Sequence, residues 1–212
     1  MLRPLLAHGI SARRGFALVA VIVMVAIIAV LAAVVGPGLA HALNQERVAK
    51  ADRSLVKLDS AIVRFKRTTR SYPGRLNHLA VQITTQDKDS CGNNYTNGQV
   101  NDWAGSTIDT IGGSYISQPV PAGGLPLAGG LGYAQDSIGR NPGGPSGVLD
   151  IRMADVPEDD AILLNDRIDG IADFVAGNEV TGNQTGKVRW IAPSATKKVL
   201  LTYVVLPPSA GC

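Results

Sequence analysis

The sequence is poor in the residues from which catalytic sites are commonly built. It has three histidines, His8, His41 and His78, and two cysteines among its 212 residues. These residues are too few and too scattered to predict a Ser/His/Asp or Cys/His arrangement. The paired glycines at 123–124 and 129–130 lack the strand, lysine and helix of a phosphate-binding loop. The sequence therefore gives no support for an enzyme or for a nucleotide site.

Charge is absent from one long stretch near the start of the chain. Residues 16–35 are 20 apolar or small residues without a single ionisable side chain. As a helix they would extend for about 30 Å, the thickness of the hydrocarbon core of a bilayer. Arg13 and Arg14 come directly before them, which favours a cytoplasmic location for that end. A cleaved secretory signal is the alternative, but its apolar core is only about 7–15 residues long.

The junction between the basic leader and the apolar run is more specific. Arg13-Arg14-Gly15-Phe16, followed by Ala17-Leu18-Val19, resembles the N-terminus of the type IV filament family, the type IV pilins and the pseudopilins of type II secretion. The resemblance implies that prepilin peptidase cleaves after Gly15 and methylates the amine of Phe16. It also implies a protein held in the inner membrane with its head in the periplasm. An assembly platform in that membrane would then build it into a filament with other pilin or pseudopilin subunits, in the periplasm or at the cell surface.

Two positions, one in the apolar run and one just after it, bear on assembly. Pro37 stands where many pilins carry a helix-bending proline, and Gly36-Pro37-Gly38 predicts a kink or local melting. Ala20 stands where most family members have a glutamate, which is thought to pair with the amine of an adjacent subunit. Tip pseudopilins of type II secretion also lack that glutamate, although they are usually larger than this chain. The resemblance therefore implies a minor subunit, at or near the filament tip.

The overall charge does not point to a nucleic-acid partner. The formal net charge is +3, but residues 1–15 hold three arginines and no acid. Without the leader, 17 Lys and Arg balance 17 Asp and Glu. Nucleic-acid binding would need a retained basic face. We interpret Arg64-Phe65-Lys66-Arg67 and Lys197-Lys198 as solvated surface.

Residues 37–70 predict an amphipathic helix. Apolar residues recur there at spacings of three and four, and charged residues occupy the other faces. The stripe consists of Val48, Ala51, Leu55, Leu58, Ile62 and Phe65. A coiled coil is the alternative, but barely three heptads are present, so we expect the helix to lie on a sheet. Tyr72-Pro73 should end it, because a residue before proline avoids the α region.

The rest of the chain predicts a head at residues 71–212 with a long irregular region at 85–147. That region is rich in glycine and lacks apolar periodicity, and Trp103, Tyr115 and Tyr133 are expected to anchor it. A strand is predicted at 148–153, a helix beginning within 155–160 and ending at Gly170, and a hairpin from 187–192 and 199–206. The expected fold class is α+β, a long N-terminal helix packed on an antiparallel sheet, as in pilins.

Cys91 and Cys212 are expected to form a disulfide, because two cysteines in an exported domain usually pair. The bridge would resemble the C-terminal disulfide loop of many type IV pilins. Two free thiols are the alternative.

A group of carboxylates is the one candidate metal site. It contains Asp155, Asp159, Asp160, Asp166 and Asp169, with Glu158 and Asp173 nearby. Calcium binds six to eight oxygens, and some pseudopilins hold calcium in this part of the chain. No Asp-x-Asp-x-Asp-Gly run is present, and acids at a helix start explain most of the group.

The expected organisation is thus a leader at 1–15, a transmembrane and filament-core helix at 16–36, an amphipathic helix at 37–70 and the head. It indicates a filament subunit of a type IV pilus or a type II secretion pseudopilus. A membrane-tethered periplasmic binding module and a tethered hydrolase are the alternatives. No catalytic residue or cofactor is predicted, apart from the calcium candidate.

We predict that the mature protein begins at methylated Phe16, because the leader ends at Arg-Arg-Gly. The intact mass of the purified mature protein tests this. A species that keeps Met1, or one that is cut near Ala40, would remove the filament interpretation.

Overall fold

The structure is a computed structural model that describes residues 11–105, 114–140, 149–170, 186–190 and 198–206. The chain divides into two compact units, Met1–Asn44 and Gln45–Cys212. Helix α1, Ser11–Thr69, contributes to both. Each unit is described by itself.

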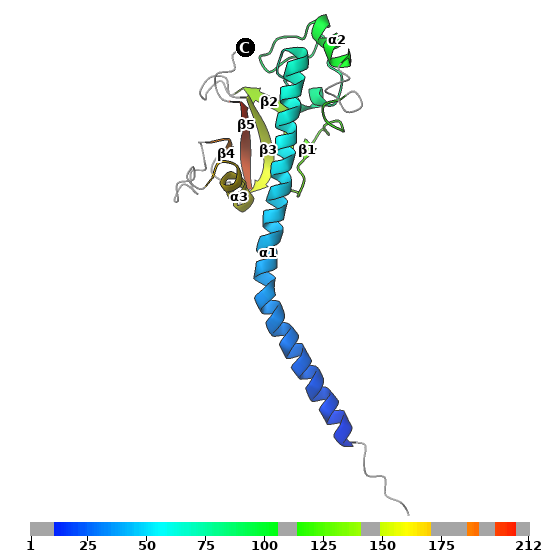
Figure 1. Ribbon diagram of the computed structural model, residues 1–212, viewed down its shortest axis with the longest axis vertical. Helices are drawn as coiled ribbons and strands as arrows, with labels where there is room; N and C mark the ends of the chain where they lie inside the picture. Colours follow the sequence, from blue (N-terminus) through cyan, green and yellow to red (C-terminus); the bar gives the residue numbers. More distant parts are fainter. Residues whose placement is uncertain (1–10, 106–113, 141–148, 171–185, 191–197, 207–212) are drawn as a thin grey trace, which may run out of the picture. The chain divides into compact units, whose positions relative to one another are not determined.

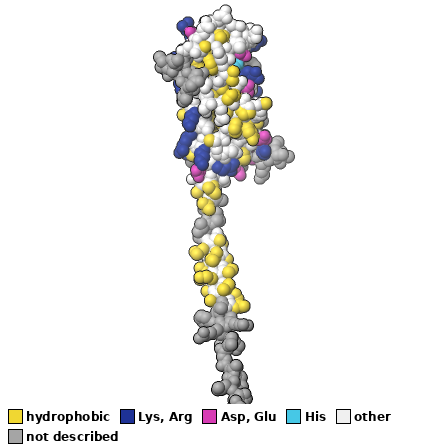
Figure 2. Space-filling model, turned by 90° about the vertical axis from the view of Figure 1, so that its right-hand side faces the viewer, with side chains coloured by type: hydrophobic (Ala, Val, Ile, Leu, Met, Phe, Trp, Pro, Cys, Tyr) yellow, Lys and Arg dark blue, Asp and Glu magenta, His cyan; other side chains and the backbone are white. Residues whose placement is uncertain are grey.

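The first unit contains the N-terminal part of α1. The large apolar side chains between residues 18 and 31 are all more than half exposed in the isolated chain, from 52% at Val23 to 68% at Met24. Figure 2 shows hydrophobic side chains, in yellow, along this part of the helix. The helix continues without a break through Gly36-Pro37-Gly38, so the local melting expected there does not occur. The structure leaves the predicted kink untested. Over the part of the chain that the structure describes, no helix has the length and apolar character needed to cross a membrane.

The second unit is built on a five-stranded sheet in the order β1-β2-β3-β5-β4. Every neighbouring pair is antiparallel. The strands are β1 Leu125–Pro126, β2 Tyr133–Arg140, β3 Leu149–Pro157, β4 Val188–Trp190 and β5 Lys198–Leu206. Figure 1 shows α1 running across one face of this sheet. The predicted α+β class with an antiparallel sheet is confirmed, and so is the pairing of the two last strands.

The apolar stripe of α1 forms one wall of the core, as its spacing predicts. All six of its side chains are at most 3% exposed. They belong to one cluster with Ile151 and Met153 of β3 and Leu201 of β5. The helix ends at Thr69, three residues before Tyr72-Pro73. The 3-10 helix η1, Leu76–Leu79, then places both of its leucines in the same core.

The region expected to be irregular, 85–147, contains regular elements. Helix α2, Asn97–Gly105, begins after Thr96, whose backbone N–H and hydroxyl group both lie within 3.0 Å of the Gln99 side-chain oxygen. In return, Gln99 N–H donates to Thr96 Oγ1. This is a capping box, and Thr96-Asn97-Gly98-Gln99 carries its sequence pattern. Strand β2 lacks clear alternation, and its pairing with β3 shifts register between Ala134 and Ile138.

Two of the three expected aromatic anchors are confirmed. Trp103 and Tyr115 are 6% and 2% exposed and meet edge to face at 6.0 Å. The Tyr115 ring also meets Phe65 of α1 at 5.4 Å. Tyr133 is 47% exposed, so the prediction that it anchors this region is wrong. It is placed by backbone pairing at the start of β2 instead.

The strand and helix in the fourth part of the sequence have shifted boundaries. Strand β3 continues to Pro157, and helix α3 spans Glu158–Ile168. Asp155 and Val156 therefore belong to the strand and not to the helix start, because β5 continues to pair through Val199 and Lys198. Gly170 closes α3 as expected: its φ is +83°, and its N–H donates to the carbonyl of Asn165.

Arg47 joins the first turns of the head half of α1 to two later segments. Its Nε donates to the carbonyl of Gly129 at 3.0 Å, and its Nη2 lies 3.3 Å from Asp160 Oδ2. Gly129 has a φ of +90°, and a Cβ there would lie 2.5 Å from the carbonyl oxygen of Arg47. A side chain would force the loop and the helix apart.

We predict that Gly129→Ala destabilises the protein by about 1–3 kcal/mol more than Gly130→Ala. Both glycines have positive φ, so both alanines add backbone strain of about 1–2 kcal/mol. A Cβ at Gly130 has nothing within 4 Å, whereas the one at Gly129 overlaps backbone and adds an overpacking cost. Urea unfolding of the two variants measures the difference. Equal losses would show that the loop moves away from α1 freely.

Candidate functional site

Three of the five carboxylates considered for calcium, Asp155, Asp160 and Asp169, have partners of their own. Asp160, in the first turn of α3, is 4% exposed and pairs with Arg47. Burial raises the pKa of Asp160, and the Arg47 charge opposes the rise. Asp155 lies 3.6 Å from Lys198 Nζ across the β3–β5 pair.

Of the remaining three carboxylates, Asp159 lies in the first turn of α3, Asp166 in its last turn, and Asp169 directly after its end. Asp169 accepts hydrogen bonds from the backbone N–H groups of Lys187 and Val188, at 3.0 and 2.7 Å. Asp159 is exposed and Asp166 is half-buried. Within the described ranges, no three His, Cys, Asp or Glu side chains are grouped to hold a metal ion. The structure therefore does not bring the five candidates together into a calcium site.

The structure describes some of the other predicted site residues. Cys91 is disulfide-bonded, and Cys212, the other cysteine of the chain, lies outside the described residues. The Ala20 side chain is exposed. Gly15, Phe16 and Pro37 lie within α1, but the exposure and contacts of these three residues are outside the described set. Cleavage at Gly15 and the roles of Ala20 and Pro37 in assembly stay predictions.

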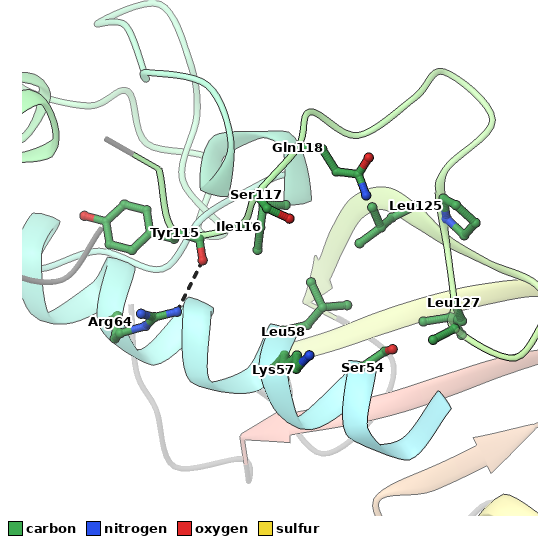
Figure 3. A pocket seen from close by; sticks show the side chains of 12 residues that line it. Ser54, Lys57, Leu58, Arg64, Tyr115, Ile116, Ser117, Gln118, Leu125 and Leu127 are labelled. Carbon is green, nitrogen blue, oxygen red and sulfur yellow. Dashed lines mark hydrogen bonds between the residues drawn. The ribbon is translucent and has the colours of Figure 1, made fainter. Parts of the chain in front are cut away.

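A groove of about 550 Å³ lies beside the head half of α1. Leu58, Ile116, Leu125 and Leu127 provide apolar side chains, and Figure 3 shows them coming from the helix, from the segment after Tyr115 and from the chain around β1. Arg64 closes one end by donating from Nη2 to the carbonyl of Tyr115 at 3.2 Å. The volume of the groove is in the range of ligand-binding clefts.

The polar border of the groove is cationic. Lys57 and Arg64, seven residues apart on one face of α1, both line it, together with Ser54, Ser117 and Gln118. Among the twelve described residues that line the groove, none is acidic and none is a histidine. The groove can thus accept an apolar group that carries a negative charge. Sequence reasoning missed it because three separate segments build it.

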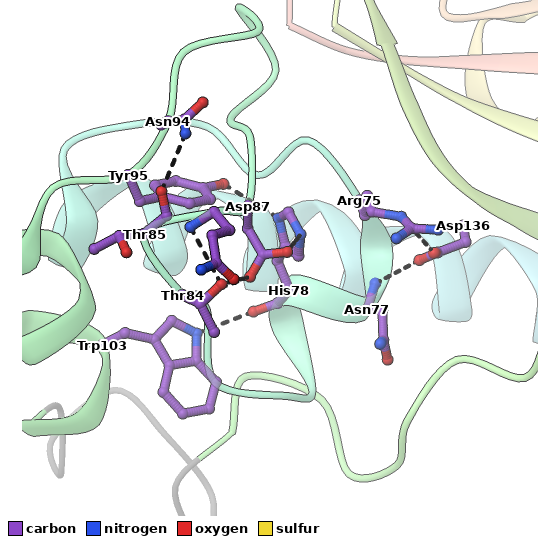
Figure 4. Close-up of polar contacts among 11 residues, drawn as sticks. Arg75, Asn77, His78, Thr84, Thr85, Asp87, Asn94, Tyr95, Trp103 and Asp136 are labelled. Carbon is purple, nitrogen blue, oxygen red and sulfur yellow. Dashed lines mark hydrogen bonds and ion pairs between the residues drawn. The ribbon is translucent and has the colours of Figure 1, made fainter.

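His78 belongs to a buried polar cluster at the far end of the core. Its ring is 6% exposed and lies on η1. Nδ1 is 3.2 Å from the hydroxyl of Tyr95, and Nε2 is 3.8 Å from Asp87 Oδ1. Figure 4 shows these side chains converging, with Trp103 donating from Nε1 to the carbonyl of His78 at 2.9 Å.

Burial shifts the pKa values of His78 and Tyr95, while hydrogen bonds and charge decide that of Asp87. Burial lowers the pKa of His78, although the negative charge of Asp87 opposes the shift. It also raises the pKa of Tyr95. At Asp87, burial acts to raise the pKa, but hydrogen bonds from Thr84 and the His78 charge outweigh it, so the pKa is lowered. No residue of the cluster lines the groove. The arrangement holds the segment 78–95 against α1 and is best read as structural.

Comparisons with family models, with curated proteins and with solved structures give no match to this chain.

We predict that His78 makes the folded state less stable in mild acid. Because its pKa is lowered from 6.5 on folding, the unfolded chain binds the proton more readily, and the free energy of unfolding falls as pH drops below about 6.5. The slope from this group is at most about 1.4 kcal/mol per pH unit. His78→Gln should remove that part of the slope between about pH 7.5 and about pH 5.5.

Urea unfolding at the two pH values measures it. His41→Gln, at an exposed histidine, is the matched control and should retain the wild-type slope. An unchanged slope in His78→Gln would contradict the structural assignment of the cluster.

Proposed function

We propose that this chain is a minor subunit of a type IV filament, either a type IV pilus or a type II secretion pseudopilus. The observation that carries the proposal is the contrast between the two parts of α1. Residues 18–31 present large apolar side chains on every face, while residues 48–65 bury one stripe against a sheet. A helix that is apolar all round needs an apolar environment on all sides.

Lipid and a bundle of similar helices are the two environments that satisfy such a helix. In the proposed function, the whole apolar segment of the sequence, residues 16–35, first lies in the inner membrane as a helix. The helix then leaves the lipid and joins the helices of other subunits in the filament core. This transfer is tolerable because one apolar environment replaces another. The long helix lying on an antiparallel sheet supports a pilin-like head.

Ala20 gives the proposed subunit its minor role. In the resembling family, a glutamate at this position pairs with the amine of an adjacent subunit inside the apolar core. A buried glutamate without a partner would cost several kcal/mol. Ala20 carries no charge, so it needs no partner. It also offers no acceptor to a neighbouring amine. A subunit of this kind fits where no neighbour requires that acceptor, as at the tip.

We expect quantitative mass spectrometry of sheared filaments to find this chain far below the major subunit. Ala20→Glu should raise its share, because a carboxylate becomes available to a neighbouring amine. Ala26→Glu is the matched control: it adds the same charge six residues further along the helix, where no amine is expected, and should lower incorporation. If the wild-type chain is the most abundant protein along the shaft, the minor and tip assignments both fail.

A further inference from the structure

The face of the sheet that points away from the core carries polar side chains at its centre. Successive residues of a strand point to opposite faces. Ile151 and Met153 of β3 and Leu201 of β5 belong to the core cluster that the stripe of α1 covers. Arg152 and Thr202, which alternate with them, therefore lie on the opposite face of the sheet. We name this the outer face.

Arg152, Thr202 and Arg189 form one row across three strands of the outer face. In the antiparallel register, Arg152 of β3 and Arg189 of β4 each pair with Thr202 of β5. Paired residues of neighbouring strands point to the same face and have Cβ atoms about 4.5–5.5 Å apart. All three side chains are half-buried. The Thr202 hydroxyl thus lies between two guanidinium-bearing side chains that solvent can reach.

Both arginines keep their forked Nη groups available. Arg152 Nε lies 3.6 Å from Asp150 Oδ2, an ion pair that is longer than a hydrogen bond. Arg189 Nε donates to the carbonyl of Gly186 at 2.8 Å. Among the residues that the structure describes, neither guanidinium group has a further hydrogen-bond or ion-pair partner. The Nη donors of both side chains are therefore free to bind an acceptor.

Asp150 balances only part of this positive charge. It is 3% exposed, and burial raises its pKa while the charges of Arg152 and Arg189 oppose the rise. One buried carboxylate is thus close to two guanidinium groups, which leaves a net positive charge. Gly139, which pairs with Asp150 across β2 and β3, makes room for the group. A Cβ there would overlap Asp150 Oδ1 and lie 3.1 Å from Arg152 Nη2.

We propose that the row of Arg152, Thr202 and Arg189 binds an oxyanion, the carboxylate or phosphate group of a small molecule. The planar forks of two arginines match the oxygen atoms of such a group, and the hydroxyl of Thr202 donates a third hydrogen bond. Asp150 holds the Arg152 side chain beside the row from below. The ligand supplies the negative charge that the buried carboxylate leaves uncompensated.

The size of the row favours a compact anion. Leu200, the next outer-face residue before Thr202 on β5, is apolar and 41% exposed, so the positive charge ends there. Further along β3, Asp155 already pairs with Lys198 at 3.6 Å. A nucleic-acid backbone or an anionic bilayer would need cations over a wider area. The inference goes beyond the proposed function and does not depend on cleavage at Gly15.

Solution NMR of the full chain in detergent micelles tests the site. Sodium phosphate or sodium acetate replaces sodium chloride at constant ionic strength, because exposed charges also respond to salt alone. We expect saturable shifts of the Thr202 amide signal and of the Arg189 Nε–H signal. The Nε–H signal of Arg75, which pairs with Asp136 elsewhere on the head, is the internal reference and should not follow them.

Variants of the row separate its parts. Arg189→Gln should weaken anion binding at least about tenfold, which is about 1.4 kcal/mol, because a charged fork is lost. Arg189→Lys keeps the charge without the fork and should weaken binding less. Thr202→Val removes the hydroxyl group and should weaken it severalfold. The matched control is Arg53→Gln, at an exposed arginine of α1, which should stay within about twofold of wild type. Urea unfolding confirms that each variant is folded.

The two anions distinguish the sources of the oxyanion. Tighter binding of phosphate assigns the site to a phosphate-bearing ligand, and tighter binding of acetate assigns it to a carboxylate-bearing one. The proposal is overturned if neither anion shifts the Thr202 signal more than chloride does, or if the Arg75 signal follows the same titration curve. It is also overturned if Arg189→Gln or Thr202→Val binds like wild type. Intact mass and filament stoichiometry, which test the proposed function, are unaffected by any of these outcomes.

Discussion

The packing of one apolar stripe of α1 on the sheet is the interaction on which the rest of the head depends. Each large side chain that is fully buried there contributes about 1.5–3 kcal/mol relative to leaving it exposed, and Leu55, Ile62 and Phe65 are completely buried. Phe65 extends the contact further, because its ring meets both Tyr95 and Tyr115. The helix therefore holds the sheet and also the long connecting segments between η1 and β1.

This packing also decides which faces of α1 remain available. With the stripe buried, the carboxylates on one flank meet cations from α3 and from the start of β4, while the cations on the other flank border the groove. One helix thus carries a part that is apolar on every side, a face that builds the core, an acidic flank that pairs with later segments and a cationic flank that borders the groove. Each of these parts follows from the pattern of apolar and charged residues in its own stretch of the helix.

Regular and local patterns were predictable from the sequence. The spacing of Val48 to Phe65 predicted the buried face of α1, and the apolar run predicted a helix with no polar side. Gly170 predicted the end of α3. The elements that were missed depend on partners distant in the chain. Strand β2 has little alternation of its own and is formed by pairing with β3, and Pro157 remains in a strand because Lys198 pairs with it. Helix α2 could have been found from its capping box.

By itself, the sequence determined the long helix, its two apolar patterns, the α+β class and the basic leader with its Gly15-Phe16 junction. Those features depend on the spacing and composition of residues near one another in the sequence, and not on contacts between distant segments. Only the tertiary structure decided which charges meet. Asp160 pairs with Arg47 and Asp169 accepts from backbone N–H groups, so the carboxylates within the described ranges are not grouped to hold a metal ion. The tertiary structure also brought residue 116 to residue 58 and made a groove, because a cavity exists only where segments far apart in sequence approach one another.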